Sequence, residues 1–168
     1  MSYPKNGFTL IELLVVIGII GILATITTIT VRTARENAKV AKAQSDIDML
    51  HTGIGQLMVD TGEWPGHQVP DEVASGSGNE MWNLASTDSG LIATDGAFLG
   101  WSGPYVADIP LDPWGNNYFI DTDYYINDDS QPCDGGSGCR EAVIVGSFGP
   151  DGVGQNQYNG DDIIKILR

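Results

Sequence analysis

The chain has 168 residues, enough for one long helix and one domain of ordinary size. Its 22 acidic residues far outnumber its 8 basic residues. Residues 43–168 contain 20 acidic and 3 basic side chains, a net charge of −17. This charge repels nucleic-acid phosphates and therefore argues against direct nucleic-acid binding.

The first element is an apolar segment from Phe8 to Val31 in which Glu12 is the single ionisable side chain. At about 1.5 Å per residue, a helix of this length can cross a hydrocarbon core of about 30 Å. A secretory signal peptide fits poorly, because its apolar region spans only about 7–15 residues and ends near an Ala-x-Ala site. We therefore predict a transmembrane helix. A carboxylate is costly in lipid, which makes Glu12 a candidate functional residue.

A second helical pattern follows Val31, with apolar residues at spacings of 4, 3, 4 and 3. This spacing is typical of a helix with one apolar face. The apolar stripe consists of Ala43, Ile47, Leu50, Ile54 and Leu57. Polar residues expected off this stripe are Asp46, Asp48, Gln56 and Asp60. Gly62 and Pro65 predict the helix end, so we expect one helix from about Phe8 to Thr61.

The remaining segments predict a small antiparallel sheet and therefore an α+β fold, with the long N-terminal helix packed on that sheet. The expected strands are 117–121, 123–126 and 142–147, which are rich in aromatic and β-branched residues. The pattern between residues 63 and 100 is weaker, and short helices could begin at 71–73 and 80–84. His51 and His67 have no second type of metal ligand at a suitable spacing, so we expect packing or surface roles for both.

Cys133 and Cys139 are separated by five residues, three of them glycine. This spacing fits a disulfide that closes a hairpin tip. Free or metal-bound thiols are the alternatives, although a metal site needs more ligands or a Cys-x-x-Cys spacing. A disulfide would indicate export from the cytoplasm.

Three motifs resemble those of the major pseudopilins of type II secretion systems, which belong to the type IV pilin-like superfamily. Residues 7–12 read Gly-Phe-Thr-Leu-Ile-Glu and precede the apolar segment. Residues 101–106 read Trp-Ser-Gly-Pro-Tyr-Val, and residues 112–118 read Asp-Pro-Trp-Gly-Asn-Asn-Tyr. We expect residues 112–118 to form a tight turn in which Trp114 caps the apolar core.

The resemblance implies that a prepilin peptidase cleaves between Gly7 and Phe8 and methylates the new N-terminus at Phe8. Phe8 and Glu12 then become the assembly residues. The implied parts are a leader (1–7), a transmembrane and filament-core helix (8–31), its amphipathic continuation (32–62) and a periplasmic globular domain (63–168). The implied location is the inner membrane, as a single-pass protein that later enters a filament.

The orientation implied by the resemblance conflicts with the distribution of basic residues. Four basic side chains follow the apolar segment, and Lys5 alone precedes it; the four are Arg32, Arg35, Lys39 and Lys42. The positive-inside rule would place this cluster in the cytoplasm. The cleavage motif and the two cysteines favour the opposite orientation, with the C-terminal domain in the periplasm.

The C-terminal segment 147–163 contains glycines at 149, 152, 154 and 160 and the acidic residues Asp151 and Asp161. Calcium binds six to eight oxygen ligands on such flexible loops, although the spacing is not that of an EF-hand. The segment resembles the C-terminal calcium loop of major pseudopilins. That resemblance implies side-chain ligation by Asp151 and Asp161, a carbonyl ligand from Phe148, and a neighbouring role for Asp162. A solvated acidic loop without calcium is the alternative.

No set of nucleophile, base and orienting residue is visible in the sequence, and no phosphate loop or cofactor motif, so we do not expect an enzyme. The expected function is that of a filament-forming major pseudopilin that drives protein export. Its expected partners are other copies of itself in a helical filament, the prepilin peptidase, minor pseudopilins, the inner-membrane secretion platform and the membrane. One alternative is a type IV pilin for adhesion, motility or DNA uptake. Another is a membrane-anchored, calcium-dependent binding module that does not polymerise.

Overall fold

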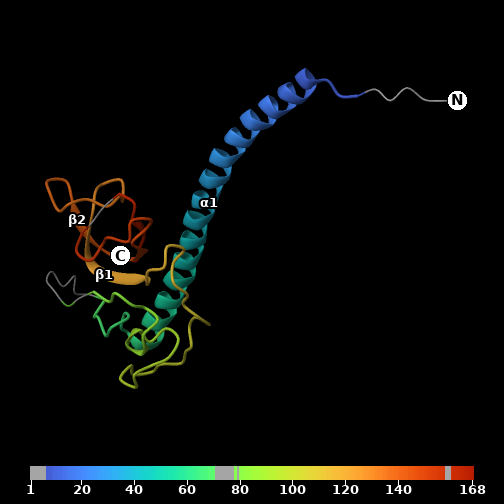
Figure 1. The fold of residues 1–168 in the computed structure, drawn as a ribbon. Coiled ribbons are helices and arrows are strands. Elements are labelled where there is room, and N and C mark those ends of the chain that lie inside the picture. The colour runs from blue at the N-terminus through green and yellow to red at the C-terminus, as the bar shows by residue number, and fades with distance from the viewer. Residues whose placement is uncertain (1–6, 71–77, 79, 158–159) are drawn as a thin grey trace. The chain divides into compact units, whose positions relative to one another are not determined.

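The computed structural model describes residues 7–70, 78, 80–157 and 160–168, without the side chains of 25–30. The elements in order are the helix α1 (Leu10–Thr61), the 3-10 helix η1 (Thr87–Ser89) and the strands β1 (Phe119–Ile126), β2 (Arg140–Ser147) and β3 (Ile163–Ile166) (Figure 1). The chain divides into two compact units, Met1–Ala38 and Lys39–Arg168. The predicted α+β class is confirmed.

In the first unit, the side chains described between residues 7 and 38 are all exposed. Large apolar side chains are among them, including Leu10 at 81% and Ile22 at 65% exposure. Apart from Glu12, residues 10–24 are apolar on every side of the helix, and a single helix has no core of its own in which to bury these side chains. Within the part of the chain that the structure describes, no helix is long and apolar enough to span a membrane.

In the second unit, α1 buries the apolar stripe predicted from the sequence. All five stripe residues, Ala43, Ile47, Leu50, Ile54 and Leu57, are at most 2% exposed. Gly62 ends the helix in the left-handed conformation (φ +76°), and its N–H donates to the carbonyl of Met58 over 2.9 Å. Glycine adopts this conformation without steric cost, so the predicted helix end is confirmed.

The three strands form an antiparallel sheet in the order β1-β2-β3. The predictions of separate strands at 117–121 and 123–126 were wrong, because β1 is one strand with an irregular register between Asp121 and Tyr124. This bulge interrupts the alternation of apolar residues, which explains why one strand resembled two. The expected strand at 142–147 is confirmed within β2, whereas β3 was not predicted.

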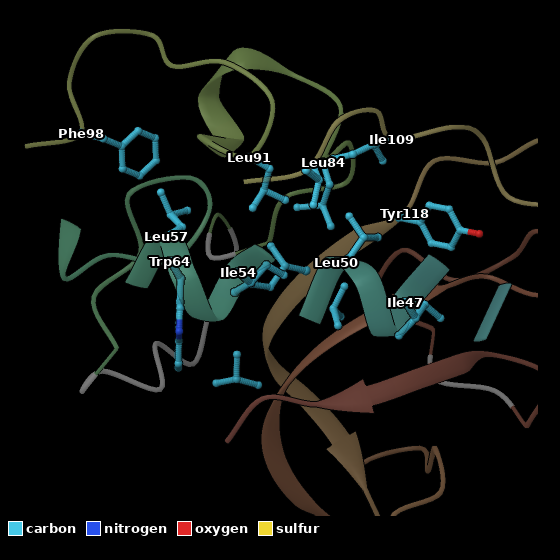
Figure 2. Packing of buried hydrophobic residues seen from close by; sticks show 14 residues of the cluster. Ile47, Leu50, Ile54, Leu57, Trp64, Leu84, Leu91, Phe98, Ile109 and Tyr118 are labelled. Atoms are coloured by element: carbon cyan, nitrogen blue, oxygen red, sulfur yellow. The ribbon is translucent and has the colours of Figure 1, made fainter. Parts of the chain in front are cut away.

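The sheet has an apolar cluster on each face. The main core joins four residues of the stripe, Ile47, Leu50, Ile54 and Leu57, to Tyr118 (Figure 2). It also contains Ile120, Val143 and Val145 of the sheet. The second cluster contains Phe119, Tyr124, Ile126, Ala142, Ile144 and Phe148. Neighbouring residues of β1 and β2 contribute to opposite clusters, as expected for extended strands.

Several residues between 63 and 100 complete the main core without forming regular structure. Trp64, Leu84, Leu91 and Phe98 are each at most 5% exposed (Figure 2). No helix begins at 80–84, because Met81 instead pairs with Ile120 of β1 through two backbone hydrogen bonds of 2.9 and 3.0 Å. The other short helix considered, at 71–73, lies outside the described residues.

Candidate functional site

The expected cleavage site lies before the first turn of α1. Gly7, Phe8 and Thr9 are outside the helix, which begins at Leu10. The Phe8 side chain is 83% exposed. An exposed, non-helical peptide bond is the substrate form that a peptidase needs. The geometry is therefore compatible with cleavage between Gly7 and Phe8.

Glu12 and Thr9 form a reciprocal cap on the N-terminus of α1. Glu12 Oε2 accepts hydrogen bonds from the Thr9 N–H at 2.8 Å and the Thr9 hydroxyl at 2.7 Å. The Glu12 N–H in turn donates to Thr9 Oγ1 at 3.3 Å. This is a capping box, and the spacing Thr-x-x-Glu would have revealed it from the sequence. The Glu12 carboxylate is thus positioned at the positive end of its own helix.

Asp46 is a buried carboxylate on α1 that the sequence analysis placed off the apolar face. It is 6% exposed, accepts a 2.9 Å hydrogen bond from the Tyr118 hydroxyl and forms an ion pair with Lys42. Burial, together with the hydrogen bond to Asp46 and its charge, raises the pKa of Tyr118. Asp46 lies beside the apolar stripe, and contact with Tyr118 buries its side chain. The helical pattern alone does not predict this contact.

Asp112 organises the turn that carries the Asp-Pro-Trp-Gly motif. Its Oδ1 accepts hydrogen bonds from the N–H groups of Trp114 (3.0 Å) and Asn116 (2.8 Å). Its Oδ2 accepts a 2.6 Å hydrogen bond from the Ser147 hydroxyl, which in turn accepts a bond from the Gly149 N–H. This 4% exposed side chain therefore links the motif to the end of β2, where the C-terminal loop begins.

Trp114 itself does not cap the apolar core. Its side chain belongs to neither apolar cluster, and the residue is only partly buried. Tyr118, four residues later, occupies the position against α1 that we expected for Trp114. The expectation for Trp114 was therefore wrong.

The C-terminal loop brings Asp151 and Asp161 together. The Asp151 N–H donates to Asp161 Oδ2 at 3.2 Å, and Asp151 Oδ1 accepts a 2.8 Å bond from the Val153 N–H. Gly149 has φ +64°, and a Cβ there would lie 2.1 Å from the carbonyl oxygen of Asp161. Only glycine allows this close backbone approach. The loop thus gathers carboxylate and carbonyl oxygens in one small region.

The other two residues expected near calcium have inward-facing side chains. Asp162 is 8% exposed and accepts a hydrogen bond from the Tyr124 hydroxyl. The Phe148 ring stacks on Phe119 with centroids 4.3 Å apart, which leaves only its backbone available as a ligand. Among the described residues, no three His, Cys, Asp or Glu side chains are grouped in a way that could hold a metal.

Cys133 and Cys139 form a disulfide with Cα atoms 6.2 Å apart. The bridge closes the connection between β1 and β2, and the Cys133 N–H donates to the Tyr125 carbonyl over 3.1 Å. The expected disulfide at this hairpin is confirmed.

Comparison with known proteins identifies the family. The prokaryotic N-terminal methylation motif matches residues 4–28. The chain is also 33% identical over 119 residues to the type II secretion system core protein G of Pseudomonas aeruginosa, covering 68% of this chain and 71% of that protein. The chain belongs to the major pseudopilin family of type II secretion systems. A major pseudopilin is a structural subunit and not an enzyme.

Within this pseudopilin, the methylation motif includes Gly7, Phe8 and Glu12, the residues at which we expected processing and assembly. Sequence reasoning missed Thr9, Asp46 and the role of Asp112. Thr9 had a local signal in its capping-box spacing. The contacts of Asp46 with Tyr118 and of Asp112 with Ser147 had none, because these partners are 72 and 35 residues away in the chain.

Proposed function

We propose that this pseudopilin is the filament-forming subunit of a type II secretion system. A prepilin peptidase removes residues 1–7 and methylates Phe8, and the subunits then polymerise through their N-terminal helices. The resulting periplasmic filament, together with minor pseudopilins and an inner-membrane platform, drives folded proteins out of the cell. The similarity to core protein G carries this proposal, and the methylation motif supports it.

Before assembly, residues 8–31 are held in the inner membrane and the C-terminal domain lies in the periplasm. The exposed apolar side chains of the first unit support this proposal, because lipid or other helices must cover them. The disulfide supports a periplasmic domain, since such bonds persist in oxidising compartments.

Glu12 sets the axial stagger between subunits in this proposal. After cleavage, the Phe8 amine is a positive charge at the start of the helix, four residues before Glu12. Pairing of Glu12 with the Phe8 amine of a neighbouring subunit is favourable where water is excluded. The capping box supports this arrangement, because it already points the carboxylate toward the N-terminus of the helix.

Calcium in the C-terminal loop is a further part of the proposal. The oxygen atoms that the loop brings together fit a hard cation, and Asp151 and Asp161 would supply the side-chain ligands. A carbonyl of Phe148 would add a backbone ligand, and Asp162 would remain beside the site through its bond to Tyr124. A bound ion would neutralise the acidic loop and hold its two ends together.

A strain in which this gene is deleted, compared with the same strain carrying the wild-type gene on a plasmid, tests the main proposal. Loss of exoprotein secretion without loss of surface pili, restored by the wild-type gene, is the expected result. Loss of surface pili with normal secretion would instead indicate a type IV pilin. Cysteine crosslinking between N-terminal helices in membranes provides the second measurement. Absence of crosslinks and of filaments would favour a membrane-anchored binding module that does not polymerise.

A further inference from the structure

His67 lies in a tight turn directly after α1. The geometry of this turn fixes the direction of the His67 side chain. The turn is closed by a 2.9 Å hydrogen bond from the Trp64 N–H to the Gln68 carbonyl. Gly66 and His67 both have positive φ angles, of 76° and 59°. The Gly66 N–H also donates to the Asp88 carbonyl over 3.0 Å. The His67 ring therefore lies between this turn and the segment that follows η1.

Both ring nitrogens of His67 face carboxylates. Nδ1 lies 2.6 Å from Glu63 Oε2, and Nε2 lies 3.1 Å from Asp95 Oδ2. An ionised carboxylate only accepts hydrogen bonds, and a neutral imidazole has a single N–H. Both contacts can therefore be hydrogen bonds at the same time only when His67 is the doubly protonated imidazolium.

The surroundings of His67 favour its positive charge. The ring stacks on Phe98 with centroids 3.9 Å apart. It borders a cavity of about 580 Å³ whose acidic side chains are Glu80, Asp88 and Asp95, and His67 is the only basic residue among the described residues that line it. Burial lowers the pKa of His67, but the hydrogen bonds and charges of Glu63 and Asp95 outweigh burial and raise it.

We propose that His67 is a proton-operated latch: as imidazolium it ties residues 94–97 to the turn after α1, and its deprotonation releases them at Asp95. The contact to Asp95 opens first because it is the longer of the two and joins residues 28 positions apart, whereas Glu63 is four positions away. Phe98 is 5% exposed and stays in the core, so it is the fixed end of the released segment.

The released segment keeps its own local structure. The Gly96 N–H donates to Thr94 Oγ1 at 2.9 Å, and the Ala97 N–H donates to Asp95 Oδ1 at 2.9 Å. These bonds do not involve His67, so residues 94–97 move as one unit. After loss of the imidazolium charge, the only charged side chains among the described residues that line the adjoining cavity are acidic, which makes its electrostatic potential more negative as the pH rises.

The first test is a pH titration of the full-length chain in detergent, purified without a histidine tag and followed by NMR. The chain has two histidines, His51 and His67. His51→Gln assigns the signals. We expect His67 to titrate above the ordinary value of 6.5. Titration of His67 at or below that value would overturn the latch.

Hydrogen exchange measures the release itself. After correction for intrinsic rates, protection of residues 92–98 is expected to fall about threefold to tenfold between the two sides of the His67 titration, as for loss of one partly exposed charged hydrogen bond. Asp95→Asn should abolish this change, because its amide can donate to neutral Nε2 and keep the segment closed. His51→Gln should leave the change intact. Equal protection on both sides of the titration in the wild type, or an unchanged pH response in Asp95→Asn, would contradict the proposal.

Discussion

The Tyr118 hydroxyl donates a 2.9 Å hydrogen bond to the buried carboxylate of Asp46, which joins the residue just before β1 to the C-terminal half of α1. Removing the hydroxyl leaves a buried carboxylate with one fewer donor. We expect Tyr118→Phe to lower the free energy of unfolding by about 1–3 kcal/mol, measured by urea denaturation of the full chain in detergent. Tyr125→Phe is the matched control, because its hydroxyl bonds to Glu141 at 3.2 Å and is only partly buried. Equal losses of unfolding free energy in the two variants would show that the contact with Asp46 stabilises the fold no more than a partly buried hydrogen bond does.

Glu12→Ala tests the proposed pairing between subunits. The variant should insert into the membrane and be cleaved, but it should fail to extend filaments, because the charge that pairs with Phe8 is absent. Membrane fractionation and electron microscopy of sheared filaments measure the two steps. Thr9→Val is the matched control, since it removes the capping partner and keeps the Glu12 charge. Normal filaments from Glu12→Ala, or equal defects in both variants, would rule out the pairing.

Gly149→Ala tests the close approach within the C-terminal loop. The new Cβ would lie 2.1 Å from the Asp161 carbonyl oxygen at a φ of +64°. The backbone strain alone should cost about 1–3 kcal/mol of unfolding free energy, and the steric clash should add to it. In the control variant Gly160→Ala, the added Cβ has no atom within 4 Å and should change stability little. Thermal unfolding of the full chain compares the two, and equal midpoints would contradict the loop geometry.

Calcium should raise the thermal midpoint of the full chain by several degrees relative to chelator. A calcium concentration 100-fold above the dissociation constant stabilises the native state by about 2.7 kcal/mol. Asp151→Asn should lose most of this calcium-dependent rise in the midpoint. Asp129→Asn replaces an exposed acidic residue outside the loop and should keep it. The same thermal midpoint with calcium and with chelator would contradict calcium binding by the C-terminal loop.

Asp121 should make stability depend on pH. Burial is the largest cause that raises its pKa, from an ordinary value of 3.8 to about 7, and the nearby carboxylates of Asp123 and Glu80 add to the effect. The folded state therefore holds a proton that the unfolded state loses above pH 3.8. The free energy of unfolding that this bound proton contributes is fully present below pH 3.8, and it is lost as the pH rises through about 7.

The variant Asp121→Asn isolates that contribution. Relative to the wild type, it should gain stability between pH 5 and pH 8, because an amide is neutral throughout this range. Urea denaturation of the full chain at several pH values measures how the free energy of unfolding changes with pH. An unchanged pH dependence in the variant would show that Asp121 ionises normally in the folded protein.

Local spacing in the amino-acid sequence was sufficient to predict several elements of the fold. The stripe on α1, its end at Gly62 and the segment of β2 all follow from side-chain periodicity or glycine conformation, which act over a few residues. The methylation motif is also a local pattern, and it led to the correct family. The capping box of Thr9 and Glu12 was equally readable, although it was overlooked.

Which polar side chains are buried, and what they contact, depends on how distant segments pack in the folded protein. Asp46 lies off the periodic stripe, yet it is buried because Tyr118 covers it. His67 has an acidic partner at a spacing of four, but its second partner, Asp95, is supplied by a distant segment. The bulge in β1 and the strand β3 depend on pairing with β2. Such contacts join residues far apart in the chain, and their energies depend on burial and direction, which local periodicity does not encode.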